Sequence, residues 1–185
     1  MPNVAAWPIA PRPFVEEAMG SWLGRLAARY RMDVWEFAQH NDLELPAAYT
    51  NVGWLLMPPL APTTVKRLAL LARIPAELIE SIQTPAEWIS NRKQVLFCIN
   101  CLFLNRIDVT APRWIREWLR PDAQPCVTHP AHVRDATPAF LARCKNFAGV
   151  LKHISRSEER RQIEGIYWHS QQQRFLASRH PSNLR

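Results

Sequence analysis

Two short pairs of metal-binding residue types stand out in the second half of the chain. The first is Cys98-Ile-Asn-Cys101, and after 24 intervening residues comes the second, Cys126-Val-Thr-His129. Two ligands three residues apart can hold one ion from a tight turn, so two such pairs supply the four corners of a tetrahedron. Three thiolates and one imidazole form a common structural zinc site, and so complete a set leaves no open position for catalysis. The spacing therefore predicts a zinc ion that stabilises the fold.

Two alternatives to this ligand set are open at the level of sequence. The cysteines could fall at these places by chance in a metal-free protein, although the pairing at both ends argues against it. His132 lies three residues beyond His129 and could replace it, so His129 is preferred only because the Cys-x-x-His step suits a tight turn. The fourth cysteine, Cys144, lies on a predicted apolar stripe and is expected to be a buried thiol.

A basic, tryptophan-bearing segment lies between the two pairs. Residues 110–120 predict a short helix that begins near Pro112 and stops at Pro121. Trp114, Ile115, Trp118 and Leu119 would gather on one side and cover the zinc site. Its arginines would project from the other side, and with three basic residues nearby they are the candidates for contact with DNA phosphates: Arg92, Lys93, Arg106, Arg113, Arg116 and Arg120.

The net charge of +7 is unevenly distributed along the 185 residues. Residues 1–92 carry eight Lys and Arg against nine Asp and Glu, whereas residues 93–185 carry fifteen against seven. A lopsided positive charge suits a polyanion, most often nucleic acid, and a solvated basic surface is the alternative.

The composition predicts a mostly α fold built from many short helices. Apolar residues make up 48% of the chain, and the sixteen Pro and five Gly leave little room for hairpins. Start signals are a capping box of Asp33 and Glu36, a cap at Thr63, and Pro at the first helical position after Thr84 and Thr137. Periodicity and these signals predict helices over residues 16–31, 33–38, 63–72, 75–82, from 85, 138–154 and 157–174.

Three regions follow from this pattern. Residues 1–90 form a small helical domain, residues 91–135 a Cys3His zinc-binding module, and residues 136–185 a basic helical segment with a frayed tail. Residues 25–32 weakly echo residues 67–74, as a duplicated helix-turn-helix would. The helices that would read a DNA groove begin with acidic residues, so a packed scaffold is favoured over groove reading.

Several classes of protein are excluded or disfavoured. The chain has no Walker loop, nucleotide-binding Gly motif or Gly-x-Ser-x-Gly elbow, and no His-x-Glu element precedes Cys98 as a zinc deaminase requires. We therefore expect neither an enzyme nor a small-molecule substrate. No apolar stretch approaches a membrane span and the first residues do not predict a secretory signal, so a cytoplasmic protein without a membrane partner is expected.

A resemblance to a known family adds to this interpretation. The stretch from Arg12 to Ala27, with Glu17 followed by Ser-Trp-Leu-Gly-Arg-Leu-Ala, resembles the opening of the TniQ family of transposition proteins. The order Cys98-x-x-Cys101, a basic stretch ending at Trp118, then Cys126-x-x-His129 is similar to that family's zinc segment. Together the two parts span roughly residues 10–133.

The resemblance implies a DNA-associated target-selection or adaptor factor that works with DNA and with other proteins of a transposition machine. It also implies Cys98, Cys101, Cys126 and His129 as zinc ligands. The alternative is a zinc-stapled protein-interaction module that meets an acidic partner protein without binding DNA.

Overall fold

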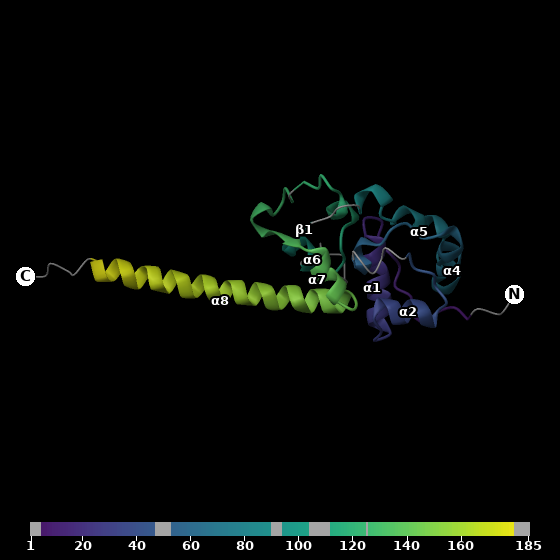
Figure 1. The fold of residues 1–185 in the computed structure, drawn as a ribbon, viewed down its shortest axis with the longest axis horizontal. Coiled ribbons are helices and arrows are strands. Elements are labelled where there is room, and N and C mark those ends of the chain that lie inside the picture. The colour runs from purple at the N-terminus through teal and green to yellow at the C-terminus, as the bar shows by residue number, and fades with distance from the viewer. Residues whose placement is uncertain (1–4, 47–52, 90–93, 104–111, 125, 180–185) are drawn as a thin grey trace, which may run out of the picture. The chain divides into compact units, whose positions relative to one another are not determined.

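The computed structural model describes residues 5–46, 53–89, 94–103, 112–124 and 126–179 (Figure 1). Among these residues the secondary structure is mostly α-helical, with one two-stranded sheet, which confirms the expected fold class. The chain divides into two compact units, residues 1–148 and residues 149–185.

Most elements of the first unit are short, as the many prolines predict. Its α-helices are α1 (Met19–Arg29), α2 (Val34–His40), α4 (Pro62–Ala72), α5 (Ala76–Ser81), α6 (Ile99–Phe103) and α7 (Pro138–Arg143). Its 3-10 turns are η1 (Trp54–Leu56), η2 (Ala86–Trp88), η3 (Arg116–Leu119) and η4 (Pro130–His132). The strands are β1 (Val95–Cys98) and β2 (Val133–Ala136), and α8 (Phe147–Arg179) continues into the second unit.

Helices α1 and α2 follow the sequence prediction closely. The apolar face of α1 is buried, with Trp22, Leu23 and Leu26 fully covered. At the start of α2 the Asp33 carboxylate accepts the backbone N–H of Glu36 at 2.7 Å, and the Glu36 carboxylate accepts that of Asp33 at 3.0 Å. The predicted capping box is therefore confirmed.

Two predicted helix starts are wrong in detail. Helix α4 begins at Pro62 with Ala61 as its cap, so Thr63 lies inside the first turn and does not cap it. Pro suits this first position because it has no N–H to leave unpaired. The start signal at Thr84 and Pro85 leads only to the single turn η2.

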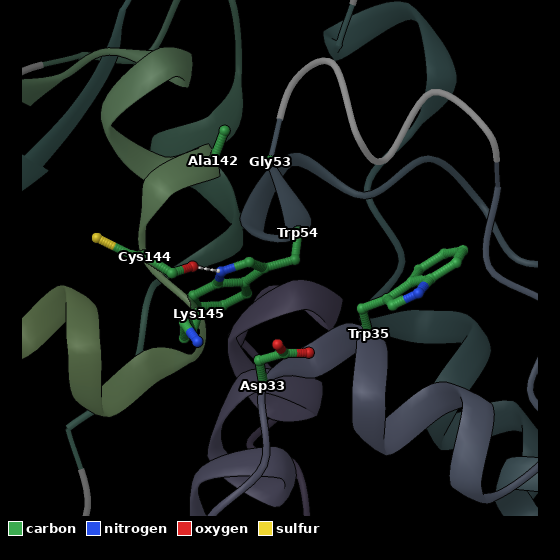
Figure 2. A pocket seen from close by; sticks show the side chains of 7 residues that line it. All are labelled: Asp33, Trp35, Gly53, Trp54, Ala142, Cys144 and Lys145. Atoms are coloured by element: carbon green, nitrogen blue, oxygen red, sulfur yellow. Dashed lines mark hydrogen bonds between the residues drawn. The ribbon is translucent and has the colours of Figure 1, made fainter.

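The boundary between the last two helices also differs from the prediction. The helix predicted over 138–154 ends at Arg143, and α8 runs unbroken through the break expected near Ser157. The helical structure is interrupted at residues 144–146 because backbone carbonyls there accept hydrogen bonds from residues far away in the sequence. The Cys144 carbonyl accepts the indole N–H of Trp54 (Figure 2). The Lys145 carbonyl accepts the backbone N–H of Val34 at 2.9 Å. A helix continued through Cys144 would have to give up these bonds.

Residues 112–115 are extended, so the helix predicted over 110–120 is wrong for its described part. Ile115 forms an isolated antiparallel bridge with Glu17. The backbone N–H of Ala18 donates to the Trp114 carbonyl, and that of Arg116 donates to the Glu16 carbonyl, both at 2.8 Å. These bonds to the start of α1 replace helical ones, and only the turn η3 follows.

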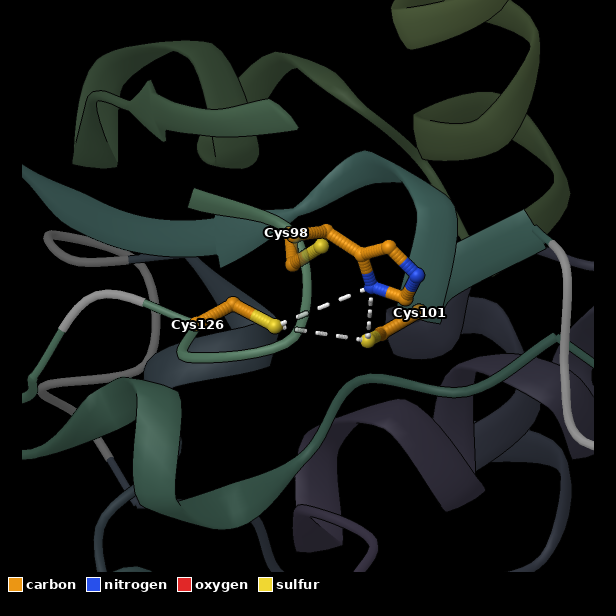
Figure 3. A group of neighbouring side chains, drawn as sticks. Cys98, Cys101 and Cys126 are labelled. Atoms are coloured by element: carbon orange, nitrogen blue, oxygen red, sulfur yellow. Dashed lines mark hydrogen bonds between the residues drawn. The ribbon is translucent and has the colours of Figure 1, made fainter. Parts of the chain in front are cut away.

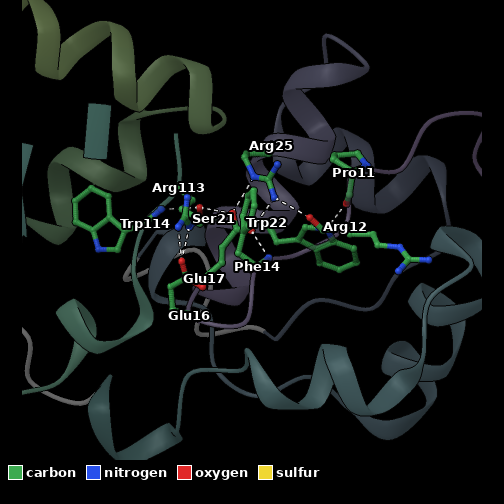
Figure 4. A network of polar contacts seen from close by, with 10 residues as sticks. All are labelled: Pro11, Arg12, Phe14, Glu16, Glu17, Ser21, Trp22, Arg25, Arg113 and Trp114. Atoms are coloured by element: carbon green, nitrogen blue, oxygen red, sulfur yellow. Dashed lines mark hydrogen bonds and ion pairs between the residues drawn. The ribbon is translucent and has the colours of Figure 1, made fainter. Parts of the chain in front are cut away.

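A buried carboxylate ties this extended segment to α1. Glu17 is fully buried, and its carboxylate accepts the Ser21 hydroxyl at 2.8 Å and the Arg25 guanidinium through two bonds of 2.8 and 2.7 Å (Figure 4). The Ser21 oxygen in turn accepts the backbone N–H of Trp114 at 2.9 Å. The acidic, Ser and Arg residues at four-residue intervals therefore form one polar network inside the core.

We predict that Glu17→Gln lowers the free energy of unfolding by about 3–5 kcal/mol, because it leaves the largely buried Arg25 guanidinium without a counter-charge. Denaturant unfolding measures this loss. The matched control is Asp42→Asn, which removes the exposed partner of Arg67 and should cost at most about 1 kcal/mol. Equal losses in the two variants would contradict a structural role for the Glu17 network.

Candidate metal centre

Four side chains from the two predicted pairs meet at one point. The ligand atoms of Cys98, Cys101, Cys126 and His129 all lie within 4.8 Å of one another, so the group could hold a metal ion. Figure 3 shows the three thiols converging from different elements of the chain. The sequence prediction that these residues come together is confirmed.

The pairing of the two strands brings the two halves of the site together. Cys98 is the last residue of β1 and pairs with Val133, the first residue of β2. His129 precedes Val133 by the turn η4, so the register places it close to the end of β1. Cys101 follows from α6, which begins directly after Cys98.

Three of the separations between ligand atoms match the edges of a tetrahedral zinc site, and all four atoms lie within 4.8 Å of one another. A Zn–S distance of about 2.3 Å and a Zn–N distance of about 2.05 Å imply S···S edges of about 3.8 Å and S···N edges of about 3.6 Å. The Cys101 and Cys126 sulfurs are 3.7 Å apart, and Nδ1 of His129 lies 3.4 and 3.8 Å from them. One four-coordinate ion of this size fits between these three atoms.

The thiols influence one another's ionisation. Burial, together with contacts to Cys126 and Cys98, raises the pKa of Cys101 to about 12. The pKa of Cys126 lies at about 7: burial opposes this shift, but hydrogen bonds from the His129 backbone, the His129 side chain and Cys101 outweigh it. Close thiolates repel one another, so a bound cation would relieve the cost of ionising all three.

The structure distinguishes between the two histidines. His129 is half-buried and belongs to the cluster, whereas His132 is exposed and is not part of it. Their ring centres are 6.3 Å apart. The described geometry therefore favours His129 as the nitrogen ligand, as the Cys-x-x-His step predicted.

Tryptophan packing supports the strand that carries Cys98. Trp114 is fully buried, with its ring centre 4.8 Å from that of Phe97 on β1 and 5.8 Å from that of Trp118. Leu119 is also fully buried. Trp114 lies in the extended segment and Leu119 in the 3-10 turn η3, so the prediction of one helical stripe is wrong. The burial of Trp114 and Leu119 is as expected.

Arg113 is engaged in a structural contact. It forms an ion pair with Glu16, with Nε 2.8 Å from a carboxylate oxygen, and its guanidinium lies 4.3 Å from the centre of the Phe14 ring (Figure 4). Partial burial acts to raise the pKa of Glu16, but the hydrogen bond and charge of Arg113 outweigh it and lower that pKa. Sequence reasoning missed this pairing because the partners are 97 residues apart.

Arg116 and Arg120 both lie over the same aromatic ring. Their guanidinium carbons are 6.0 and 5.6 Å from the centre of the Trp88 ring. Arg116 also donates to the Ser81 carbonyl, and Arg120 pairs with Asp122 at 2.9 Å. The other three predicted basic contacts, Arg92, Lys93 and Arg106, lie outside the described residues.

Among the described residues, the fold is mostly helical and contains a cluster of three cysteines and one histidine that could hold a metal ion. A family model described as TniQ matches residues 8–132, so the chain belongs to the TniQ family. Comparisons with curated proteins and with solved structures found no match. Membership implies a role associated with transposition, in a family of adaptor proteins not known as enzymes. Within the described residues, no helix has the length and apolar character needed to cross a membrane.

We predict that Cys101→Ser reduces the metal content of purified protein from about one ion per chain to near zero, because a hydroxyl is a poor replacement for a thiolate ligand. Elemental analysis measures metal per chain. Cys144→Ser is the matched control, since Cys144 is a buried cysteine outside the cluster. Full metal retention in Cys101→Ser would contradict the site.

The histidines offer a second test of the ligand set. We predict that His129→Ala lowers metal affinity at least tenfold in a chelator competition, because it removes one of four ligands. His132→Ala should leave that affinity unchanged. The reverse result would assign the fourth ligand position to His132.

Proposed function

We propose that the cluster holds one structural zinc ion. Three thiolates and one imidazole form the donor set that Zn²⁺ prefers, and the observed separations fit its radius. The ion would contribute binding energy to folding and would cross-link β1, α6 and the loop before β2. With all four positions filled by the protein, Cys98, Cys101, Cys126 and His129 would hold the module together without activating water.

We further propose that the chain is a DNA-associated adaptor that helps a transposition machine select its target. Family membership is the observation that carries this proposal, and the Cys3His cluster supports it. In this function the chain works in the cytoplasm with DNA and other transposition proteins, without a membrane partner, a small-molecule substrate or a catalytic step of its own.

The proposed DNA contacts of the module are its predicted basic residues: Arg92, Lys93, Arg106, Arg113, Arg116 and Arg120. Among the described residues, support is strongest for Arg116 and Arg120, whose side chains are 31% and 44% exposed and lie over one aromatic ring. The two guanidinium groups can contact phosphates while their cation–π interaction with the Trp88 ring keeps the side chains in place. Arg113 is only 12% exposed, so its contribution to the surface is indirect.

One observation favours the second candidate function, a zinc-stapled protein-interaction module. Each of the three described candidate arginines has a carboxylate nearby: Arg113 lies next to Glu16, Arg116 next to Glu117, and Arg120 next to Glu117 and Asp122. The local charge is therefore nearly balanced, which suits a mixed protein interface better than a polyanion.

We predict that the full chain binds duplex DNA with an affinity that falls steeply as salt rises, because phosphate contacts release counterions. Fluorescence anisotropy of a labelled duplex, titrated at three salt concentrations with a mildly acidic protein as competitor, measures this. Arg116→Gln combined with Arg120→Gln should weaken binding equally for unrelated sequences.

The matched control for that variant is Lys66→Gln combined with Arg73→Gln, which removes two exposed charges from α4 and the residue that follows it. It should leave DNA affinity unchanged. Absence of duplex binding by the unmodified chain, with retained binding of the acidic competitor, would favour the protein-interaction module.

A further inference from the structure

The positive charge of the chain is concentrated after the metal module. Residues 136–185 contain nine Lys and Arg against three Glu, which accounts for six of the seven net positive charges. By contrast, Arg113, Arg116 and Arg120 of the module lie next to carboxylates. A polyanion would therefore be attracted mainly to the C-terminal segment, most of which is the helix α8.

Basic residues form a stripe along α8. Lys152, Arg156 and Arg160 follow one another at four-residue intervals, so they lie on one face, with successive side chains about 6 Å apart along the axis. All three are exposed. Within the described part of the chain neither arginine forms an ion pair, although Glu159 lies at the edge of the same face.

Two exposed apolar side chains continue this face toward the C-terminus. Ile163 and Tyr167 follow Arg160 at intervals of three and four residues and are 66% and 57% exposed. Together with the three cations they define the basic stripe: Lys152, Arg156, Arg160, Ile163 and Tyr167. A face that mixes cations with a tyrosine hydroxyl suits contact with phosphates and sugars.

From this stripe we infer that α8 contacts the sugar-phosphate backbone of DNA without reading its sequence, an inference that rests on the proposed DNA-associated function. An α-helix is narrow enough to enter or cross the major groove, and evenly spaced cations along a rod match evenly spaced phosphates. The stripe carries no Asn or Gln to pair with base edges, so it would provide affinity and orientation.

The arrangement favours DNA over a membrane surface. Helices that lie on membranes place apolar residues and charges on opposite faces. Here Ile163 and Tyr167 share the face of the cations, and Trp168, 69% exposed, lies well away from that face. Insertion of either side would bring charged residues into the lipid.

The test compares double variants of the full chain in duplex titrations over a range of salt concentrations. Arg156→Gln with Arg160→Gln should weaken binding of unrelated duplexes equally and reduce the slope of log affinity against log salt by about 2. Arg116→Gln with Arg120→Gln should reduce it by less, because carboxylates already balance those charges. Lys66→Gln with Arg73→Gln should leave it unchanged, and helical content should be equal in all three.

Three outcomes would overturn the inference. An unchanged slope in the α8 variant, with the unmodified chain binding DNA, would remove α8 from the DNA surface and leave the proposed function standing. No duplex binding by the unmodified chain would overturn the DNA function itself. Binding to vesicles of phosphatidylserine and phosphatidylcholine that is lost in the α8 variant, with DNA binding intact, would assign the stripe to a membrane.

Discussion

The buried Glu17 carboxylate is the constraint on which the arrangement of the first unit depends. A carboxylate without solvent is costly unless its oxygens are occupied, and here Ser21 and Arg25 occupy them from the next two turns of the chain. Because Ser21 also accepts the N–H of Trp114, the network fixes where the extended segment between the two ligand pairs of the metal module can lie. The residues that resemble the opening of the TniQ family are therefore a structural clamp, which explains why an acidic residue, Ser and Arg occur together at that spacing.

The metal cluster would provide a second restraint, because its ligands lie in the chain on both sides of the segment that contains Trp114. Two strands of four residues each give little stability by themselves, and the module has few other elements to bury. An ion bound by Cys98 and His129 would join the end of β1 to the approach to β2 and so fix their register. Trp114, packed on Phe97, then connects the cross-linked strands to the clamp. Trp114 thus links the core to the strand that ends at Cys98.

Local signals predicted much of this structure, and tertiary contacts account for what they missed. The stripe on α1 and the capping box of α2 depend on residues a few positions apart, and the Cys3His set consists of two pairs with a recognisable three-residue spacing, so the sequence was sufficient to predict all three. The sequence pattern of the segment before η3 predicts a helix, but backbone hydrogen bonds to Glu16 and Ala18, nearly a hundred residues away, hold the segment extended. The end of α7 likewise depends on Trp54. No local pattern contains such partners, and the neutralisation of Arg113 by Glu16 was invisible for the same reason.

The long separation between Ser21 and Trp114 has a consequence for synthesis. During translation, Ser21 is synthesised 93 residues before Trp114, whose backbone N–H its hydroxyl oxygen accepts. Until then the Glu17 carboxylate and the Arg25 guanidinium on α1 are only partly enclosed. Closing so large a loop costs more entropy than closing a short one, and contacts of such high sequence separation slow folding. Until the module is made, the nascent N-terminal helices present an unfinished apolar surface, and this interval is when the newborn chain most needs protection by chaperones.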